Sequence, residues 1–133
     1  MPDSPVPNAS EDAQLGLLMS LYRKAVATAH PATCLPRHLP KVPDGGRVQI
    51  IGAGKAAAAM AQATERHYAE AGEAGRISGF VTTRHGFKLP TAIIEIIEAG
   101  HPMPDANSIS GAARAIEAAR TAGPDDLVLV LLS

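Results

Sequence analysis

Apolar positions in the first part of the chain repeat at helical spacing. This pattern predicts a helix from about Ser10 to His30 with one apolar face, which carries Leu15, Leu18, Met19, Tyr22, Val26 and Ala29. Asn8 with Glu11 three residues later resembles a capping box at its start. Pro31 ends it, because proline disfavours helical backbone in the residue before it.

Proline and glycine dominate two other parts of the N-terminal region. Residues 1–10 hold three prolines in the first seven positions, and we expect a flexible tail there. Residues 31–46 contain further prolines and end in a glycine pair, which predicts an irregular connector. The domain itself is therefore expected to span residues 11–133.

From residue 47 onward, strand-like and helix-like stretches alternate. This order predicts an α/β domain with a Rossmann-like, mainly parallel sheet and helices on both faces. Ligands of such sheets bind beyond the carboxyl ends of the strands. The expected strands cover residues 47–51, 77–83, 92–98 and 126–132, and the expected helices cover residues 55–71 and 106–122.

The last expected strand is the most hydrophobic stretch of the chain. Residues 127–132 read Leu-Val-Leu-Val-Leu-Leu, so we expect a central place in the sheet. A central parallel strand normally continues into a loop and a covering helix, yet the sequence stops at Ser133. An apolar strand left uncovered would be an aggregation hazard. We therefore expect a truncated N-terminal part of a larger protein.

Composition narrows the function classes. The net charge is −1, from 12 basic and 13 acidic residues, which gives no general attraction to nucleic acid or anionic membranes. Aromatic residues make up 3%, so stacking platforms for single-stranded nucleic acid are not expected. No apolar run approaches the ~20 residues that cross a bilayer. The single cysteine, Cys34, sits among prolines without an activating base; we interpret it as structural and expect a cytoplasmic protein.

A glycine turn carries the first candidate chemistry. Gly52-Ala53-Gly54-Lys55 follows a strand and opens a helix, and a helix N-terminus with an added lysine is an anion site. The P-loop pattern does not fit, because Ala56 supplies no hydroxyl for Mg²⁺.

Three interpretations of the turn stay open on the residues alone. Gly52, Gly54 and Ala57 match a dinucleotide-binding pattern, with Arg84 placed to meet the 2′-phosphate of NADP. Alternatively, Lys55 serves phosphoryl transfer or a carboxylate substrate. The turn can also be merely structural.

A second motif follows the third expected strand. Gly100 allows a sharp turn, and two prolines fix the loop that holds His101 and Asp105 at a strand's carboxyl end. Asp105 also has the position of an N-cap for the next helix. Both residues are candidates for substrate or phosphate binding, together with Gly52, Ala53, Gly54, Lys55 and Ser133.

These motifs together resemble a known family. Gly52-Ala-Gly-Lys-Ala56 with Met60-Ala61, then residues 98–105 (Glu-Ala-Gly-His-Pro-Met-Pro-Asp), then residues 126–133 are similar to the N-terminal part of glycerate 2-kinases. Some members carry the older label hydroxypyruvate reductase. The similarity runs from about residue 15 to the end of the chain, with His30 where the family commonly has aspartate.

The resemblance implies ATP-dependent phosphorylation of D-glycerate on its 2-hydroxyl, in a cleft between two α/β domains. It implies ATP and Mg²⁺ as cofactors and maps the family's glycine-turn lysine onto Lys55. It also implies a Gly-Gly-Gly-Ser loop after Ser133 and a second domain, so we expect the isolated chain to be inactive. The alternatives are an NAD(P)H-dependent hydroxypyruvate reductase and a non-enzymatic scaffold. The metal ligands and the general base stay unassigned, and homo-oligomer formation stays open.

Overall fold

The computed structural model describes residues 9–133. The predicted tail at positions 1–8 and the Asn8 cap lie outside the described residues. The first helix, α1 (Ala9–Ala29), is confirmed and begins slightly earlier than predicted, so positions 9 and 10 are helical and do not belong to a tail.

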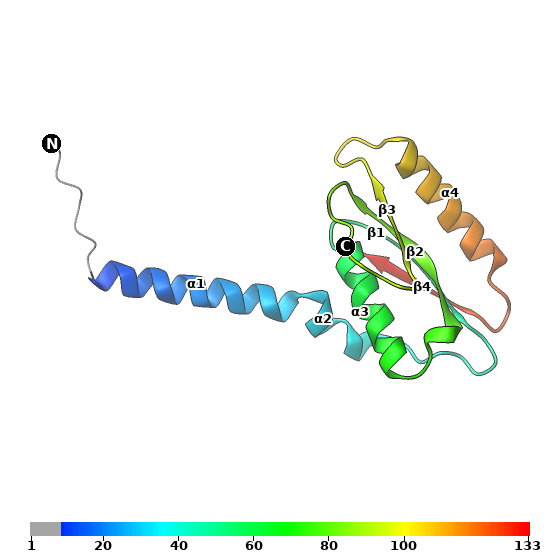
Figure 1. Cartoon of the computed structure of the whole chain (residues 1–133), viewed down its shortest axis with the longest axis horizontal. Helices are drawn as coiled ribbons and strands as arrows, with labels where there is room; N and C mark the ends of the chain where they lie inside the picture. Colours follow the sequence, from blue (N-terminus) through cyan, green and yellow to red (C-terminus); the bar gives the residue numbers. More distant parts are fainter. Residues whose placement is uncertain (1–8) are drawn as a thin grey trace.

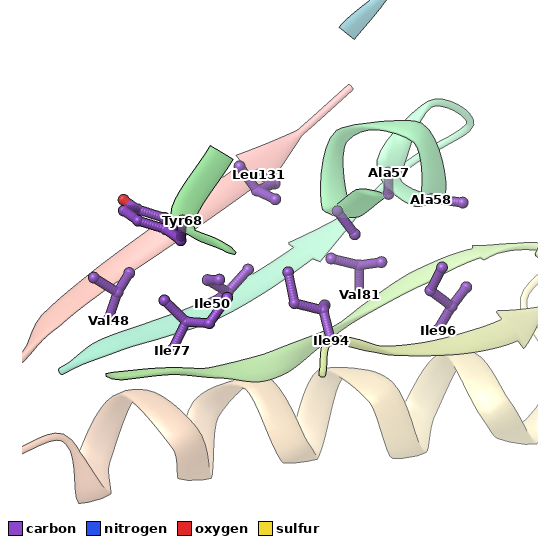
Figure 2. Close-up of a cluster of buried hydrophobic side chains, with 11 residues drawn as sticks. Val48, Ile50, Ala57, Ala58, Tyr68, Ile77, Val81, Ile94, Ile96 and Leu131 are labelled. Carbon is purple, nitrogen blue, oxygen red and sulfur yellow. The ribbon is translucent and has the colours of Figure 1, made fainter. Parts of the chain in front are cut away.

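Four parallel strands form one sheet: β1 (Val48–Ala53), β2 (Ile77–Arg84), β3 (Glu95–Ala99) and β4 (Leu127–Leu132). Their order is β3-β2-β1-β4. Helix α3 (Ala57–Glu70) covers one face and α4 (Ala106–Thr121) covers the other, as Figures 1 and 2 show. The predicted α/β class, the parallel pairing and the helices on both faces are confirmed.

Strand β4 lies at the edge of this sheet and pairs only with β1 among the described residues. The expectation of a central place was wrong for this sheet, where β1 and β2 are central. Leu131 faces α3 and is buried, whereas Val130 and Leu132 are 50% and 70% exposed. Hydrophobicity alone did not predict the edge position, because one face of β4 is not covered by the described residues. The strand order reverses between β1 and β4, and such a switch point is where parallel sheets bind ligands.

The core lies between the sheet and α3 (Figure 2). Alternate residues of β1 and β2 point to this side, among them Val48, Ile50 and Val81, which are all fully buried. They meet the alanines of α3 at Ala57 and Ala61. Small side chains let the helix axis approach the sheet closely, so the alanine bias of the sequence is explained by packing.

The β2–β3 crossover has no helix of its own and is held by Glu65 of α3. The Glu65 carboxylate accepts hydrogen bonds from the backbone amides of Ala92, Ile93 and Ile94 at 2.7 to 2.8 Å. These amides are therefore unavailable to a sheet ladder, and β3 begins at Glu95 rather than at the predicted residue 92.

The connector before β1 is more ordered than predicted. It contains the short helix α2 (Pro31–Cys34) and a 3-10 turn, η1 (Pro36–His38). The Tyr68 hydroxyl donates to the Pro40 carbonyl at 2.8 Å, and Arg76 donates to the Pro43 and Gly46 carbonyls. These tertiary contacts take the place of the hydrogen bonds of regular structure, and the proline-rich composition did not predict them.

Helix α1 projects from the α/β body (Figure 1). Its apolar residues at the predicted positions are exposed, with Leu18 and Tyr22 at 63% and 66%. The spacing predicted the helix correctly, but within the described residues its apolar side chains are not buried against another element. Within residues 9–133, no helix combines the length and apolar character needed to span a membrane.

Candidate active site

A cleft of about 340 Å³ opens where β1, β2 and β3 end, beneath the first turns of α4. Six of the seven candidate residues line it: Gly52, Ala53, Gly54, Lys55, His101 and Ser133. Ala56 and Ser133, which are 77 positions apart in the chain, are joined by a hydrogen bond at this edge of the sheet. Asp105, the seventh, is not among the lining residues.

Small residues of α4 leave the room for this cleft. Gly111, Ala112 and Ala115 face the strand ends. A Cβ atom on Gly111 would come within 2.7 Å of the Thr82 hydroxyl, so the helix can lie this close to β2 only with glycine there.

The backbone amides of the glycine turn are mostly occupied by the chain itself. The Gly54 amide donates to the Thr82 carbonyl at 3.1 Å and the Ala57 amide to the Gly54 carbonyl at 3.2 Å. The Ala56 amide donates to the Ser133 hydroxyl at 2.9 Å. In this structure the amides of Gly54, Ala56 and Ala57 therefore have acceptors within the chain, and anion binding by the turn stays a prediction.

The two glycines are likewise explained by packing of the chain on itself. A Cβ on Gly52 would lie 2.5 Å from the Leu131 carbonyl oxygen, and one on Gly54 would lie 2.3 Å from the Ser133 carbonyl oxygen. Gly54 also has φ +127, a backbone angle that L-residues rarely adopt. The space that a pyrophosphate would need at a dinucleotide turn is thus filled by β4 and Ser133.

Two cationic side chains of the cleft remain available. Lys55 is exposed and makes no hydrogen bond or ion pair within the described chain. Arg84, at the end of β2, stacks on Phe87 with its guanidinium carbon 3.5 Å from the ring centroid. The Arg84 Nε atom is buried and has no hydrogen-bond partner in residues 9–133. A small apolar-walled cleft with two unpaired cations is suited to a small anion.

Asp105 is confirmed as the N-cap of α4. Its carboxylate accepts from the Ser108 amide at 3.0 Å, and the Ser108 hydroxyl accepts from the Asp105 amide, which completes a capping box. Asp105 also lies 2.9 Å from Nε2 of His85. The bond to His85, together with amide bonds from Gly100 and Ser108, holds the pKa of this carboxyl far below its usual range.

His85 and Glu98 also lie at this edge, although neither was among the candidate site residues. The Glu98 carboxylate accepts hydrogen bonds from the amides of Gly86, Phe87 and Lys88, and these bonds lower its pKa, with the Lys88 amide contributing most. For His85 the signal was the polar run at the carboxyl end of β2, which lies beside the glycine turn in a parallel β1-β2 pair.

The described residues do not offer a metal site. No group of three or more His, Cys, Asp or Glu side chains among residues 9–133 is placed to hold a cation. The two carboxylates at this edge, Asp105 and Glu98, are already engaged by His85 and by backbone amides. The residues present therefore do not fit Mg²⁺, and the filled glycine turn does not fit the phosphates of ATP.

The strand order and the switch point define the class: an α/β domain of Rossmann-like topology, with a cleft lined by Lys55 and Arg84 at the carboxyl edge of its sheet. Residues 17–133 match the model of a family described as a domain of unknown function, DUF4147. The chain belongs to this family, and its relatives include the glycerate 2-kinases that the sequence motifs resemble.

Three comparisons describe these relatives. A protein of Agrobacterium vitis, provisionally named hydroxypyruvate reductase, is 42% identical over 88% of this chain and 26% of its own length. The D-glycerate 2-kinase of Thermotoga maritima is 36% identical over 88% of this chain and 27% of its own length. The crystal structure of the Thermotoga maritima glycerate kinase superposes with a TM-score of 0.73 at 30% identity, covering 91% of this chain and 28% of that one. The chain thus spans about a quarter of the length of the relatives it matches.

Proposed function

We propose that residues 11–133 form the N-terminal α/β part of a glycerate 2-kinase, and that the complete enzyme phosphorylates the 2-hydroxyl of D-glycerate with ATP to give 2-phosphoglycerate. The observation that carries the proposal is the pair of unpaired cations, Lys55 and Arg84, in a cleft at the carboxyl edge of the sheet. The kinase names of the Thermotoga maritima and Pyrococcus horikoshii relatives support it.

The size of the cleft limits what this chain can hold by itself. At about 340 Å³ it lies near the lower end of the ~300–1,000 Å³ of small-molecule sites. That volume suits a three-carbon acid and is small for a whole nucleotide. In this proposal the ATP and Mg²⁺ sites come from sequence outside residues 1–133, and the chain contributes the acid-binding half.

Phosphoryl transfer depends mainly on positioning and charge stabilisation. Lys55 follows Gly54 at the mouth of the cleft and is exposed. A lysine ammonium on a flexible stem can follow a moving negative charge. Its role in the proposal is to stabilise the negative charge that develops on the transferring phosphoryl group.

A nicotinamide-dependent reductase is the weaker alternative, although some relatives carry that name. Binding of a dinucleotide would require the backbone around Gly54 to be open, and Ser133 fills that space. Absorbance at the nicotinamide band, with NADPH and hydroxypyruvate as substrates, separates the two activities directly.

The test is a kinase assay on a full-length protein that contains this segment, with Lys55→Ala. Loss of one charge contact that stabilises the transition state typically lowers the rate by ~10²-fold or more, and we expect a fall of that order in kcat/KM for D-glycerate. Lys41→Ala, which removes an exposed lysine of the connector, is the matched control and should leave kcat/KM unchanged. Equal kcat/KM for wild type and Lys55→Ala would refute the role of Lys55.

A further inference from the structure

We propose that Arg84 is the residue that binds the carboxylate of the substrate in this cleft, and so selects small hydroxy acids. The inference rests on the proposed function and makes it more specific, because it assigns one end of the substrate to one side chain.

The first argument is the state of the arginine. Arg76 donates to carbonyl oxygens and pairs with Glu73 at 3.3 Å, and Arg114 pairs with Glu95 at 2.6 Å. Arg84 has no such partner in the described part of the chain, and its Nε atom is buried. Leaving a buried donor of a charged group without an acceptor is more unfavourable than leaving an exposed one, which water can satisfy. An anionic ligand bound directly to this guanidinium would offset that penalty.

The second argument is that the carboxylates of the same sheet edge are committed elsewhere. Glu98 accepts from three amides of the loop after β2, and Asp105 accepts from His85 and from the first turn of α4. Neither carboxylate has a hydrogen bond or ion pair with Arg84. The positive charge of Arg84 is therefore not neutralised by the fold.

The third argument is position. The register pairs Ala53 of β1 with Thr82 of β2, and Lys55 and Arg84 each follow their paired residue by two positions. Two adjacent strands thus deliver two different cations to one cleft. The Phe87 ring packs against the guanidinium of Arg84 and limits its movement, whereas the Lys55 side chain is exposed.

This difference decides which anion each cation takes. A planar guanidinium presents two parallel N–H donors, which match the two oxygens of a carboxylate that stays in place during reaction. A flexible lysine suits the phosphoryl group, whose position changes. The carboxylate on Arg84 and the phosphoryl group near Lys55 leave the 2-hydroxyl, one carbon from the carboxylate, between them.

The experiment uses the 133-residue chain labelled with ¹⁵N and follows the arginine Nε–H resonances by NMR. D-glycerate is titrated first, then inorganic phosphate, then glycerol, which has the hydroxyls but no carboxylate. We expect a saturable shift of the Arg84 resonance with D-glycerate, weaker effects with phosphate and none with glycerol. Arg84→Gln should weaken D-glycerate binding by ~10-fold or more, and Arg84→Lys should recover only part of the loss, because it keeps the charge without the fork.

Arg120→Gln, an exposed arginine at the end of α4, is the control and should bind D-glycerate like wild type. Circular dichroism of each variant confirms that it is folded. Unchanged D-glycerate affinity in Arg84→Gln overturns the inference and leaves the kinase proposal standing. Tighter binding of phosphate than of D-glycerate at Arg84 overturns the carboxylate assignment. Absence of any shift in the wild-type chain overturns it as well, while the kinase assay on the full-length protein decides the proposed function separately.

Discussion

Replacing Gly54 with alanine should destabilise the domain more than replacing a glycine whose only constraint is its positive φ angle, such as Gly72. Two effects add at this position. Backbone at φ +127 is unfavourable for an L-residue by ~1–3 kcal/mol. The new Cβ would also lie 2.3 Å from both the carbonyl oxygen and the hydroxyl of Ser133, so Ser133 must move.

Moving Ser133 breaks two hydrogen bonds. They are the bond from its amide to the Ala53 carbonyl at 3.2 Å and the bond from the Ala56 amide to its hydroxyl at 2.9 Å. Each is worth about 1 kcal/mol, so together with the strain the total loss in Gly54→Ala is about 3–5 kcal/mol. That is a large part of the ~5–15 kcal/mol by which a domain is stable.

Gly72→Ala isolates the strain, because Gly72 has φ +76 and no atom lies within 4 Å of the position that the new methyl group would take. Its expected loss is about 1 kcal/mol, the difference between left-handed strain and the gain from a stiffer unfolded chain. Urea unfolding followed by circular dichroism gives both values. Losses that agree within about 0.5 kcal/mol would refute the claim that Ser133 packs into the glycine turn.

Two further substitutions test the supports of the site. Burial raises the pKa of Glu65, but the hydrogen bonds from the amides of Ala92, Ile94 and Ile93 more than offset that rise, so its pKa lies below the usual value. A lowered pKa in the folded state stabilises the domain at pH values above the unfolded pKa of ~4.3, and that stability is lost as the pH falls through the folded value. Glu65→Gln should lower the free energy of unfolding by about 1.5–3 kcal/mol at about pH 7. It should also reduce the loss of stability on acidification, measured by urea unfolding between about pH 3 and 7. Tyr68→Phe removes the donor to the Pro40 carbonyl and should cost about 1–2 kcal/mol in the same assay, whereas an unchanged midpoint would mean that the connector is not held there.

The sequence alone predicted the long helices, the strands and the edge of the sheet at which the candidate site residues lie. Alternating apolar runs and glycine turns predicted all four strands and the three long helices, because local spacing alone distinguishes them. The meeting of Lys55, His101 and Ser133 at one cleft followed from a general rule about parallel strands, and the structure confirms it.

What the sequence did not predict depends on distant partners. The hydrophobic sequence of β4 indicates apolar neighbours, but it does not determine whether the strand takes a central or an edge position in the sheet. The capture of three crossover amides by Glu65 joins positions 27 to 29 residues apart, and no local pattern contains that information. The burial of Arg84 Nε is likewise a tertiary property, since an arginine at a strand end is usually solvated.

The backbone amides of the glycine turn have acceptors within the chain, which gives the turn a structural role. A helix N-terminus binds an anion through free N–H groups, but here Ser133 and Thr82 accept from the amides of Ala56 and Gly54. The turn therefore acts as a rigid joint between β1 and β4, and its glycines serve that joint. In the proposed function, the positive charge that binds the anion therefore comes from side chains. Within the described chain the cleft has two cations that no carboxylate neutralises, Lys55 and Arg84. Substitutions at the glycines should then act through stability, and substitutions at the two cations through binding, which is a separation that unfolding and titration experiments on the same variants can measure.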